Sequence, residues 1–267
     1  MEGIEEKYLI GEKIGCGASG CVYRATDKQT GEVVAIKEIS LKKFSKEKTV
    51  KEIENIRYLT PQCPQVVRYI DYIDDPSTNR VFIITEYIDA KPFNEIKDRT
   101  NMILFKQLVK AIQCIHFNDI YHSDIKPDNI IFTDTDVKII DIGMSCTKAD
   151  DRCWSHTGFT PNYASPEALG GITSFEMAMA ADIWGMAASF YKLLNGKPPL
   201  NKSFEAYFRA YKSRFKYMDL GRIARDYQEM LIPSNSGDKE MDGVMDKILV
   251  VNWEERPKIE QILEMIE

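Results

Sequence analysis

The sequence predicts an α+β fold of two lobes, in which a small β-rich lobe with one main helix precedes a larger helical lobe. Residues 8–40 are rich in Val, Ile, Tyr and Gly, and their apolar runs break at 15–20 and 28–31, which is typical of β-hairpins. Residues 44–59 instead carry an apolar side chain at about every third position, which indicates an amphipathic helix. After Ala90 and Pro92 the patterns become long and helical. We therefore expect one domain over residues 1–267, with lobes of about 1–87 and 92–267 and a hinge at about 86–91.

The remaining elements follow from the same periodicities. The helix over residues 44–59 is expected to end at Pro61, and two strands are expected at 66–73 and 80–88 around a turn. In the second lobe, short apolar strands at 130–132 and 137–140 are expected to pair as a hairpin. The predicted helices of this lobe cover residues 102–117, 178–194, 204–218, 223–230, 241–251 and 259–266.

Composition excludes several classes of function. The chain has 44% hydrophobic and 28% charged residues, which is ordinary for a globular protein. Its net charge of -6 argues against nucleic-acid binding through phosphate neutralisation. The sequence has no apolar h-region at its start and no window of 18 uninterrupted apolar residues, so we expect no membrane insertion. These features predict an intracellular, cytoplasmic protein and leave the oligomeric state open.

The six cysteines are scattered, without C-x-x-C pairs or histidines at zinc spacing. We interpret them as reduced thiols of an intracellular protein. One pair, Cys146 and Cys153, is close enough in the chain to close a loop disulfide, although two unrelated thiols are the favoured interpretation.

The glycine-rich stretch at residues 15–22, GCGASGCV, has the form G-x-G-x-x-G-x-V. Glycines allow backbone N–H groups to come close to phosphate oxygens, but the same pattern occurs in dinucleotide-binding folds and in plain turns. A dinucleotide site needs a helix directly after the glycines, whereas residues 22–26 read as a strand that the turn at 29–31 completes as a hairpin. The glycines are therefore expected at a hairpin tip that can cover a nucleotide.

A lysine closes the apolar run V-A-I-K on the next predicted strand. A cation among apolar neighbours, with a glutamate on a helix downstream, is well placed to hold nucleotide phosphates. Glu52, on the helix face that carries Ile53 and Ile56, is the candidate that orients Lys37. Glu54 is the alternative, although its position favours a solvent-facing residue.

The stretch YHSDIKPDN, residues 121–129, lies in a loop between the helix predicted at 102–117 and an apolar strand. The second strand of the hairpin leads directly to Asp141, with Gly143 two residues on. Pairing of the two strands would bring Asn129 and Asp141 to the same end of the hairpin. An amide and a carboxylate oxygen suit Mg²⁺. Asp124 would then face the transferred group.

Together these motifs resemble the eukaryotic protein kinase family, over nearly all of residues 8–266. The glycine loop, V-A-I-K, H-x-D-x-K-x-x-N and D-x-G occur in the family's order, and Ser165-Pro166-Glu167 and Asp182-Ile183-Trp184 follow. Arg256 matches a late arginine that pairs with the glutamate at Glu167 in relatives. The resemblance implies the two-lobed protein kinase fold.

The resemblance also implies phosphoryl transfer from ATP with Mg²⁺, which depends on positioning and charge compensation. It implies that Lys37, oriented by Glu52, holds the α- and β-phosphates and that Lys126 meets the γ-phosphate. Asp124 would orient the substrate hydroxyl and accept its proton. The residues implied to carry Mg²⁺ are Asn129 and Asp141.

The nucleotide site implied by the resemblance is lined by both lobes. Thr85 would be a small gatekeeper, and backbone groups of Glu86 and Ile88 would read the adenine edge. The adenine would lie between Ile14, Val22 and Ala35 above and Ile131 below, and the phosphates would lie under Gly15, Gly17 and Gly20.

The substrate class follows from the loop type. Asp-Ile-Lys-Pro-Asp-Asn, with Thr160-Pro161-Asn162-Tyr163, resembles serine/threonine kinases rather than tyrosine kinases. The expected acceptor is a serine or threonine of a protein substrate.

Two departures from the family pattern need weighing. Ser123 replaces the arginine that pairs with an activation-loop phosphate in most relatives, which puts phosphate-dependent switching in doubt. Ile142 replaces phenylalanine in D-F-G, an apolar exchange that should keep its packing against Ile56 and His122. His122 is interpreted as a packed core histidine.

The long polar loop over 142–167 carries five hydroxyl residues that could be autophosphorylated, Ser145, Thr147, Ser155, Thr157 and Thr160.

Two other functions compete with an active protein kinase. A pseudokinase would keep the fold as a nucleotide-binding or scaffolding module, but Lys37, Asp124, Asn129 and Asp141 are all present, which favours the enzyme. An enzyme with a lipid or small-molecule acceptor is the weakest alternative. The aromatic residues of 204–218 suggest either a docking surface or a packed helix, and the packed helix is favoured.

Overall fold

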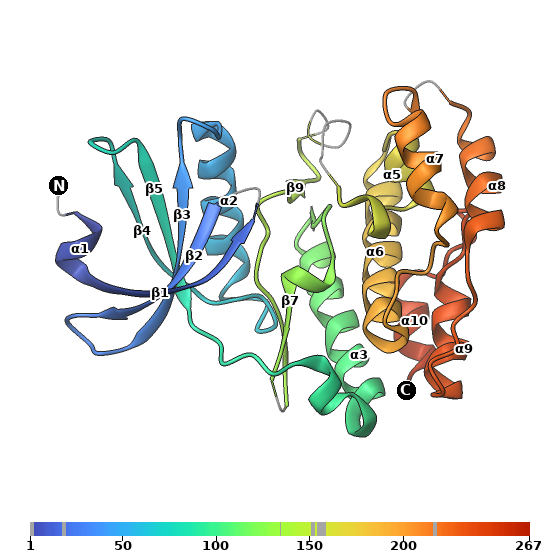
Figure 1. Cartoon of the computed structure of the whole chain (residues 1–267), viewed down its shortest axis with the longest axis horizontal. Coiled ribbons are helices and arrows are strands. Elements are labelled where there is room, and N and C mark those ends of the chain that lie inside the picture. Colours follow the sequence, from blue (N-terminus) through green and yellow to red (C-terminus); the bar gives the residue numbers. More distant parts are fainter. Residues whose placement is uncertain (1–2, 18–19, 134, 151–152, 154–158, 216–217) are drawn as a thin grey trace. The chain divides into compact units, whose positions relative to one another are not determined.

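The computed structural model describes residues 3–17, 20–133, 135–150, 153, 159–215 and 218–267. The chain divides into two compact units. The first unit comprises Met1–Ala90 and Ile140–Gly143, and the second comprises Lys91–Ile139 and Met144–Glu267. An antiparallel sheet dominates the first unit and helices dominate the second, so the α+β prediction is confirmed (Figure 1).

The first unit is built on one five-stranded antiparallel sheet in the order β1-β2-β3-β5-β4 (Figure 1). The hairpins predicted for residues 8–40 are confirmed. β4 begins later than predicted, because Val66 and Val67 are buried and the Val66 N–H closes a turn onto the Cys63 carbonyl. The elements are α1 (Ile4–Lys7), β1 (Tyr8–Gly17), β2 (Gly20–Asp27), β3 (Val33–Ser40), α2 (Lys46–Leu59), β4 (Tyr69–Asp75) and β5 (Arg80–Glu86).

Apolar side chains cover both faces of this sheet. Along β5 all four residues from Val81 to Ile84 are buried, so the strand reads as a continuous apolar run rather than an alternation. Phe82 and Ile84 join one core cluster, and Val81 and Ile83 join another that includes Ile53 of α2. The helix predicted for residues 44–59 is confirmed as α2, which is followed by Thr60 and Pro61.

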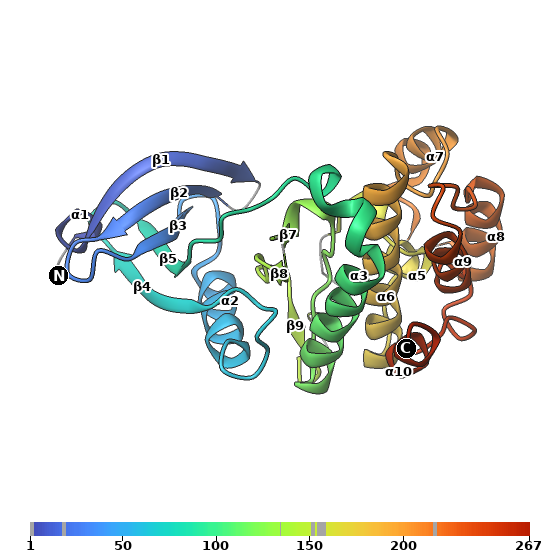
Figure 2. The ribbon, with the colours of Figure 1, turned by 90° about the horizontal axis from the view of Figure 1, so that it is seen from below.

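Helices form most of the second unit (Figure 2). α3 begins nine residues before its predicted start, because Phe93 is buried edge-on against Phe132 and Phe190 although the residues after it lack apolar periodicity. α8 and α9 also begin earlier, each behind an aspartate that caps a backbone N–H. The helices are α3 (Phe93–Phe117), α5 (Pro166–Gly170), α6 (Phe175–Asn195), α7 (Ser203–Tyr211), α8 (Leu220–Met230), α9 (Lys239–Ile248) and α10 (Ile259–Met265).

α6 is the central helix of this unit. It contacts α3, α5 and α9, and most of its residues are buried on every side, as expected of a helix enclosed by others. The Ser174 hydroxyl caps its first turn by accepting a hydrogen bond from the Met177 N–H, and Gly196 ends it in the left-handed conformation at φ 75°. The core of the second unit is therefore organised around α6.

Aromatic rings pack α7 against its neighbours. The helix is shorter than the predicted 204–218, because the chain turns after Tyr211 and brings Phe215 back onto Tyr207 and Phe208. Residues 216–217 of the predicted helix lie outside the described residues. Phe204 and Phe215 are buried, so the packed interpretation is confirmed for these two rings.

Short elements carry the loops between these helices. The predicted hairpin of residues 130–140 is confirmed, with Ile130 opposite Ile139. After β8 the chain enters the first unit for Ile140–Gly143 and then returns. The elements are β6 (Ile120–Tyr121), η1 (Pro127–Asn129), β7 (Ile130–Phe132), β8 (Val137–Ile139), β9 (Cys146–Thr147) and η2 (Pro161–Tyr163).

The interpretation of the cysteines as reduced thiols is wrong, because all six cysteines are disulfide-bonded and none of those in the described residues is free. Cys16 and Cys21 form a disulfide because the register of β1 and β2 places them directly opposite each other. Cys146 and Cys153 form the loop disulfide that was the less favoured alternative. Sequence spacing alone does not reveal the cross-strand pair, which depends on the register at the hairpin tip.

A buried ion pair joins α5 to the segment before α10. Two guanidinium nitrogens of Arg256 contact the two carboxylate oxygens of Glu167 at 2.5 and 3.2 Å, and both side chains are fully buried. Arg256 also donates to the carbonyls of Ala180 and Val250 and lies over the Trp184 ring. The pairing expected between Glu167 and Arg256 is confirmed.

In the part of the chain that the structure describes, no helix has both the length and the apolar character needed to cross a bilayer.

Replacing Arg256 by alanine is expected to destabilise the second unit by about 3–5 kcal/mol, because Glu167 would be left buried without a counter-charge. Urea unfolding followed by tryptophan fluorescence measures this loss. Arg222→Ala is the matched control, since the exposed Arg222 lies 3.9 Å from the half-buried Asp226 and this pair should be worth less than about 1 kcal/mol. Equal losses in the two variants would contradict the importance of the buried pair.

Candidate active site

In the first unit, Lys37 lies between two carboxylates. Its ammonium nitrogen is 2.6 Å from Glu52 Oε1 and 3.1 Å from Asp141 Oδ1. β3 supplies the lysine, α2 supplies Glu52, and Asp141 belongs to the returning segment Ile140–Gly143. The structure thus brings together three residues that the sequence analysis singled out, whereas the alternative Glu54 is exposed on α2.

Burial and charge act in opposite directions on this lysine. Burial by itself lowers the pKa of Lys37, but the negative charges of Glu52 and Asp141 outweigh it and raise that pKa above its ordinary value. Burial also raises the pKa of Glu52, with the Lys37 cation opposing and the Asp141 charge adding to the effect. The Lys37 side chain therefore remains a cation at neutral pH, as binding of a phosphate requires.

A side chain in place of the glycine of the D-x-G motif would crowd this cluster. A Cβ at Gly143 would lie 2.8 Å from Glu52 Oε2 and 3.0 Å from Asp141 Oδ1. The Gly143 N–H also donates to Asp141 Oδ1 at 2.9 Å, which fixes the orientation of that carboxylate. Ile142, which replaces the family's phenylalanine, is buried.

In the second unit, Asp124 is the centre of a separate polar cluster. Its Oδ2 accepts a hydrogen bond from the Lys126 ammonium at 2.5 Å, and its Oδ1 accepts one from the Thr160 hydroxyl at 2.7 Å. The Lys126 ammonium also donates to Thr160 Oγ1 at 3.2 Å. A carboxylate can accept about four hydrogen bonds, so both oxygens keep acceptor capacity beyond these contacts.

Asn129 is fixed beside this cluster by its own amide. Its side chain is buried in the short helix η1, and its Nδ2 donates to the Asp124 backbone carbonyl at 2.9 Å. Because Nδ2 is used in this way, the amide oxygen Oδ1 points to the other side, where it is a suitable oxygen donor for a hard cation. Among the described residues, no group of three or more His, Cys, Asp or Glu side chains forms a metal site.

Asp182 of α6 holds the loop that carries Asp124. This buried carboxylate accepts hydrogen bonds from the backbone N–H groups of His122 at 2.6 Å and Ser123 at 2.8 Å. His116, at the end of α3, contacts the same carboxylate at 2.9 Å. Ser123 has a φ of 73°, a conformation that costs free energy in a non-glycine residue, and the Asp182 bonds offset this cost.

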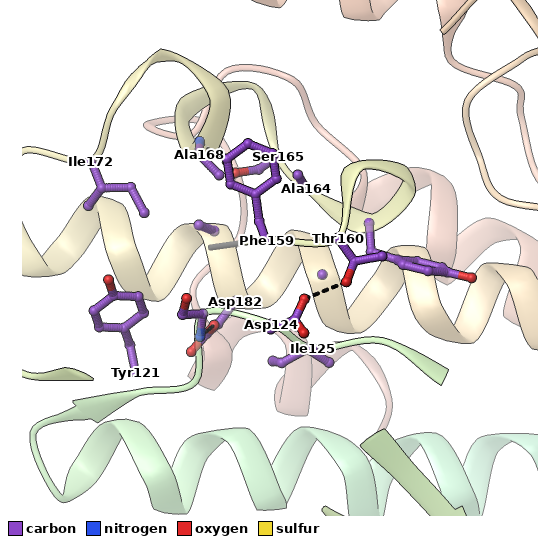
Figure 3. Close-up of a pocket in the computed structure, with 14 residues that line it drawn as sticks. Tyr121, Asp124, Ile125, Phe159, Thr160, Ala164, Ser165, Ala168, Ile172 and Asp182 are labelled. Atoms are coloured by element: carbon purple, nitrogen blue, oxygen red, sulfur yellow. Dashed lines mark hydrogen bonds between the residues drawn. The ribbon is translucent and has the colours of Figure 1, made fainter. Parts of the chain in front are cut away.

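A small cavity lies between Asp124 and the segment that carries Phe159 and Thr160 (Figure 3). The hydrogen bond between Thr160 and Asp124 crosses it, and Ser123 and Asp182 also line it. Its volume of about 20 Å³ is room for roughly one water molecule, far below that of a ligand pocket. We therefore assign it to the interior of the loop rather than to a nucleotide site.

The residues expected around the nucleotide lie in both units. In the first unit, the adenine candidate Ala35 lies opposite the gatekeeper candidate Thr85, and Val22 lies opposite Lys37. Ile131 of β7 is in the second unit. The other candidates of the first unit are Ile14, Gly15 and Gly17 on β1, Gly20 at the start of β2, Glu86 at the end of β5, and Ile88 beyond it.

Two contacts at the site were missed by reasoning from the sequence. Thr160 was read only as a marker of substrate class, yet it binds the Asp124 carboxylate from 36 positions away. Asp182 was read only as part of a family motif, yet it holds the backbone of the loop. No local spacing signals either contact. His122 is buried, as expected of a packed histidine, and its Nδ1 accepts from the Asp124 N–H at 3.3 Å.

The chain was compared with known proteins. It matches the family described as protein kinase domain over residues 8–266. It is 31% identical over 220 residues to a probable myosin light chain kinase of Dictyostelium discoideum, covering 76% of this chain and 69% of that protein. It is 30% identical over 274 residues to a CBL-interacting serine/threonine-protein kinase of Arabidopsis thaliana, covering 97% of this chain and 57% of that protein.

A third relative is an SNF1-like protein kinase of Schizosaccharomyces pombe, 31% identical over 208 residues, which cover 74% of this chain and 35% of that protein. The chain thus spans only part of the length of these relatives. The family match covers almost the whole chain and contains both polar clusters. The chain belongs to the protein kinase family.

Proposed function

We propose that this chain is an ATP-dependent serine/threonine protein kinase that transfers the γ-phosphate of ATP to hydroxyl groups of protein substrates. The observation that carries the proposal is the cluster at Asp124, where an alcohol already donates a hydrogen bond to the carboxylate. The curated relatives named as serine/threonine kinases support the same acceptor class. The proposed catalytic domain comprises residues 1–267, with a hinge at about 86–91.

Asp124 is proposed as the residue that orients the acceptor and takes its proton. The Thr160 hydroxyl lies 2.7 Å from Asp124 Oδ1, which is the distance at which a substrate hydroxyl would donate its proton. Lys126 is within 3.2 Å of both groups and would place its positive charge beside the transferred phosphoryl group. The acceptor oxygen would then attack phosphorus as the bond to the β–γ bridging oxygen breaks.

Lys37 is proposed to hold the α- and β-phosphates. Glu52 positions its ammonium group, and the raised pKa of Lys37 keeps it charged. The adenine is proposed to contact Ile14, Val22, Ala35 and Ile131 and the backbone of Glu86 and Ile88, with Thr85 as gatekeeper and Gly15, Gly17 and Gly20 near the phosphates.

Mg²⁺ is the proposed metal, with Asn129 and Asp141 as its protein ligands. The donor set fits, because one residue offers a carboxylate and the other an amide oxygen whose nitrogen is already hydrogen-bonded. When bound, Mg²⁺ would neutralise charge on the phosphate oxygens. Orientation of the donors is the contribution of the chain itself.

A pseudokinase is the competing function. It is not favoured, because the residues that phosphoryl transfer needs are present and already contact one another in two clusters. A lipid or small-molecule acceptor has no supporting observation. The proposed setting is the cytoplasm, where ATP is available as the substrate.

Changing Asp124 to asparagine is expected to lower phosphoryl transfer by about 10²- to 10⁴-fold, because the amide cannot accept the hydroxyl proton. Transfer of ³²P from ATP to generic protein substrates measures the effect. Asp128→Asn is the matched control, since this exposed carboxylate lies in the same loop and should retain most activity. Equal transfer by wild type and Asp124→Asn would defeat the assignment, and nucleotide binding without transfer by the wild type would indicate a pseudokinase.

Changing Asp141 to asparagine is expected to weaken Mg²⁺-dependent binding of ATP by about tenfold or more, since a charge-assisted ligand is lost. A fluorescent ATP analogue titrated with MgCl₂ or with EDTA measures the affinity. Wild type should bind more weakly in EDTA, and the variant should lose most of this difference. Asp74→Asn removes a comparable carboxylate paired with Lys46 and should behave as wild type. A variant with the full Mg²⁺ response would contradict the metal assignment.

Activity is expected to be independent of activation-loop phosphorylation. The Asp182 bonds hold the loop through the backbone of His122 and Ser123, so they do not need the arginine that Ser123 replaces. Two of the candidate phosphorylation sites, Ser155 and Thr157, lie outside the described residues. Phosphatase treatment, verified by mass spectrometry, should change activity by less than about twofold. A change of this size corresponds to the small free-energy effect of an ordinary surface substitution. A large loss on dephosphorylation would refute this expectation.

A further inference from the structure

Two cysteines face each other at the tip of the glycine-rich hairpin. β1 and β2 lie side by side (Figures 1 and 2), and their register places Gly15 opposite Val22, Cys16 opposite Cys21 and Gly17 opposite Gly20. The Cα atoms of the two cysteines are 4.0 Å apart, and their sulfur atoms are bonded. The register of the two strands therefore places the two cysteines close enough for their sulfur atoms to bond.

This pair differs from the Cys146–Cys153 disulfide in its access to solvent. Cys16 is exposed and Cys21 is half-buried, whereas Cys146 belongs to a core cluster and is only 2% exposed. Reaction of a cysteine with oxidants or with other thiols requires access to its sulfur. Cys16 is consequently the cysteine that a dissolved oxidant or reductant can reach most readily, since Cys114 and Cys153 are half-buried and Cys63 and Cys146 are buried.

We infer that Cys16 and Cys21 form a reversible dithiol–disulfide site that controls nucleotide affinity, an inference that rests on the proposed kinase function. The oxidant is a hydroperoxide and the reductant is a dithiol. The Cys16 thiolate attacks one oxygen of the peroxide and breaks the O–O bond, which gives a sulfenic acid and a hydroxide that takes up the proton released by the thiol and becomes water. The Cys21 thiolate then attacks the Cys16 sulfur and displaces hydroxide, which takes up a proton. Two thiols and one hydrogen peroxide thus give one disulfide and two waters.

The reverse step is thiol–disulfide exchange. A dithiol attacks one sulfur, forms a mixed disulfide, and then closes on itself as both cysteine thiols are released. In a cytoplasmic protein a disulfide of this kind is typically transient or redox-sensing rather than structural. An exposed pair at the edge of the proposed nucleotide site fits that class.

The disulfide acts on a part of β1 that is exposed from Gly11 to Gly17. Among the described residues, an added Cβ at Gly15 or Gly17 would meet no atom within 4 Å, and glycines carry the largest backbone entropy in an unrestrained chain. Apart from the backbone ladder to β2, little side-chain packing of the described residues holds this end of the strand in place. Oxidation joins Cys16 to Cys21 and so keeps the ladder closed to Gly17 and Gly20.

The ladder is also connected to the phosphate-binding lysine. Cys21 lies opposite Glu38 and Val22 lies opposite Lys37 on β3. Gly20 is pressed so closely onto β3 that a Cβ there would be 2.1 Å from the Glu38 carbonyl oxygen. When the β1–β2 ladder is closed to its end, the hairpin is held on the strand that carries Lys37. The hairpin is then already in position for the phosphates before the nucleotide binds.

The oxidised chain is expected to bind ATP about 2- to 10-fold more tightly than the reduced chain and to release it correspondingly more slowly. The apparent affinity falls in proportion to the fraction of molecules whose ladder is closed, so this range corresponds to a closed fraction of about a half to a tenth in the reduced chain. The full chain is reduced with dithiothreitol or oxidised with hydrogen peroxide, and binding and release of methylanthraniloyl-ATP with Mg²⁺ are followed by fluorescence. Peptide mapping by mass spectrometry reports the Cys16–Cys21 bond in each sample.

Two double variants make the test specific. Changing both Cys16 and Cys21 to serine should remove the difference between the oxidised and reduced samples, and changing both Cys146 and Cys153 to serine should leave it in place. Affinity that is equal in both redox states although the bond forms, a bond that peroxide does not form, or weaker binding on oxidation would each overturn the inference while leaving the kinase proposal intact. Failure to bind nucleotide in either state would overturn both.

Discussion

The buried carboxylate of Asp182 is the interaction on which the proposed catalytic loop depends. It accepts two backbone N–H bonds, from His122 and Ser123, and a contact from His116, so one side chain of the central helix joins α3, α6 and the loop. Because the bonds go to backbone groups, they act on the path of the chain rather than on one side chain. The positive φ of Ser123 is maintained by them. Because Asp124 is the next residue, the position of its side chain depends on that backbone path.

A different constraint acts in the first unit, where three charged side chains must lie close together. Lys37 lies between Glu52 and Asp141, and Gly143 leaves just enough room for both carboxylates. Burial makes each charge costly alone, so the lysine and its partners stabilise one another. The departure at Ile142 leaves this arrangement in place. Local geometry therefore explains why a glycine suits the last position of the motif.

The sequence predicted those parts of the fold and site that depend on local pattern. Periodicity located α2 and the β7–β8 hairpin, and motif spacing identified Lys37, Glu52 and Asp141. Contacts between distant positions were not predictable in this way. The bond from Thr160 to Asp124 spans 36 positions and requires knowledge of the chain path. The start of α3 was missed for a similar reason, because packing of Phe93 against two other rings overrides a polar first turn.

The pairing of Glu167 with Arg256 has a consequence for how the chain is made. The two residues are 89 positions apart. While the polypeptide is emerging from the ribosome, the carboxylate has no access to its guanidinium partner until the intervening residues and Arg256 have been translated. The helical unit therefore cannot complete its core before that point, and until then the carboxylate stays hydrated rather than enclosed.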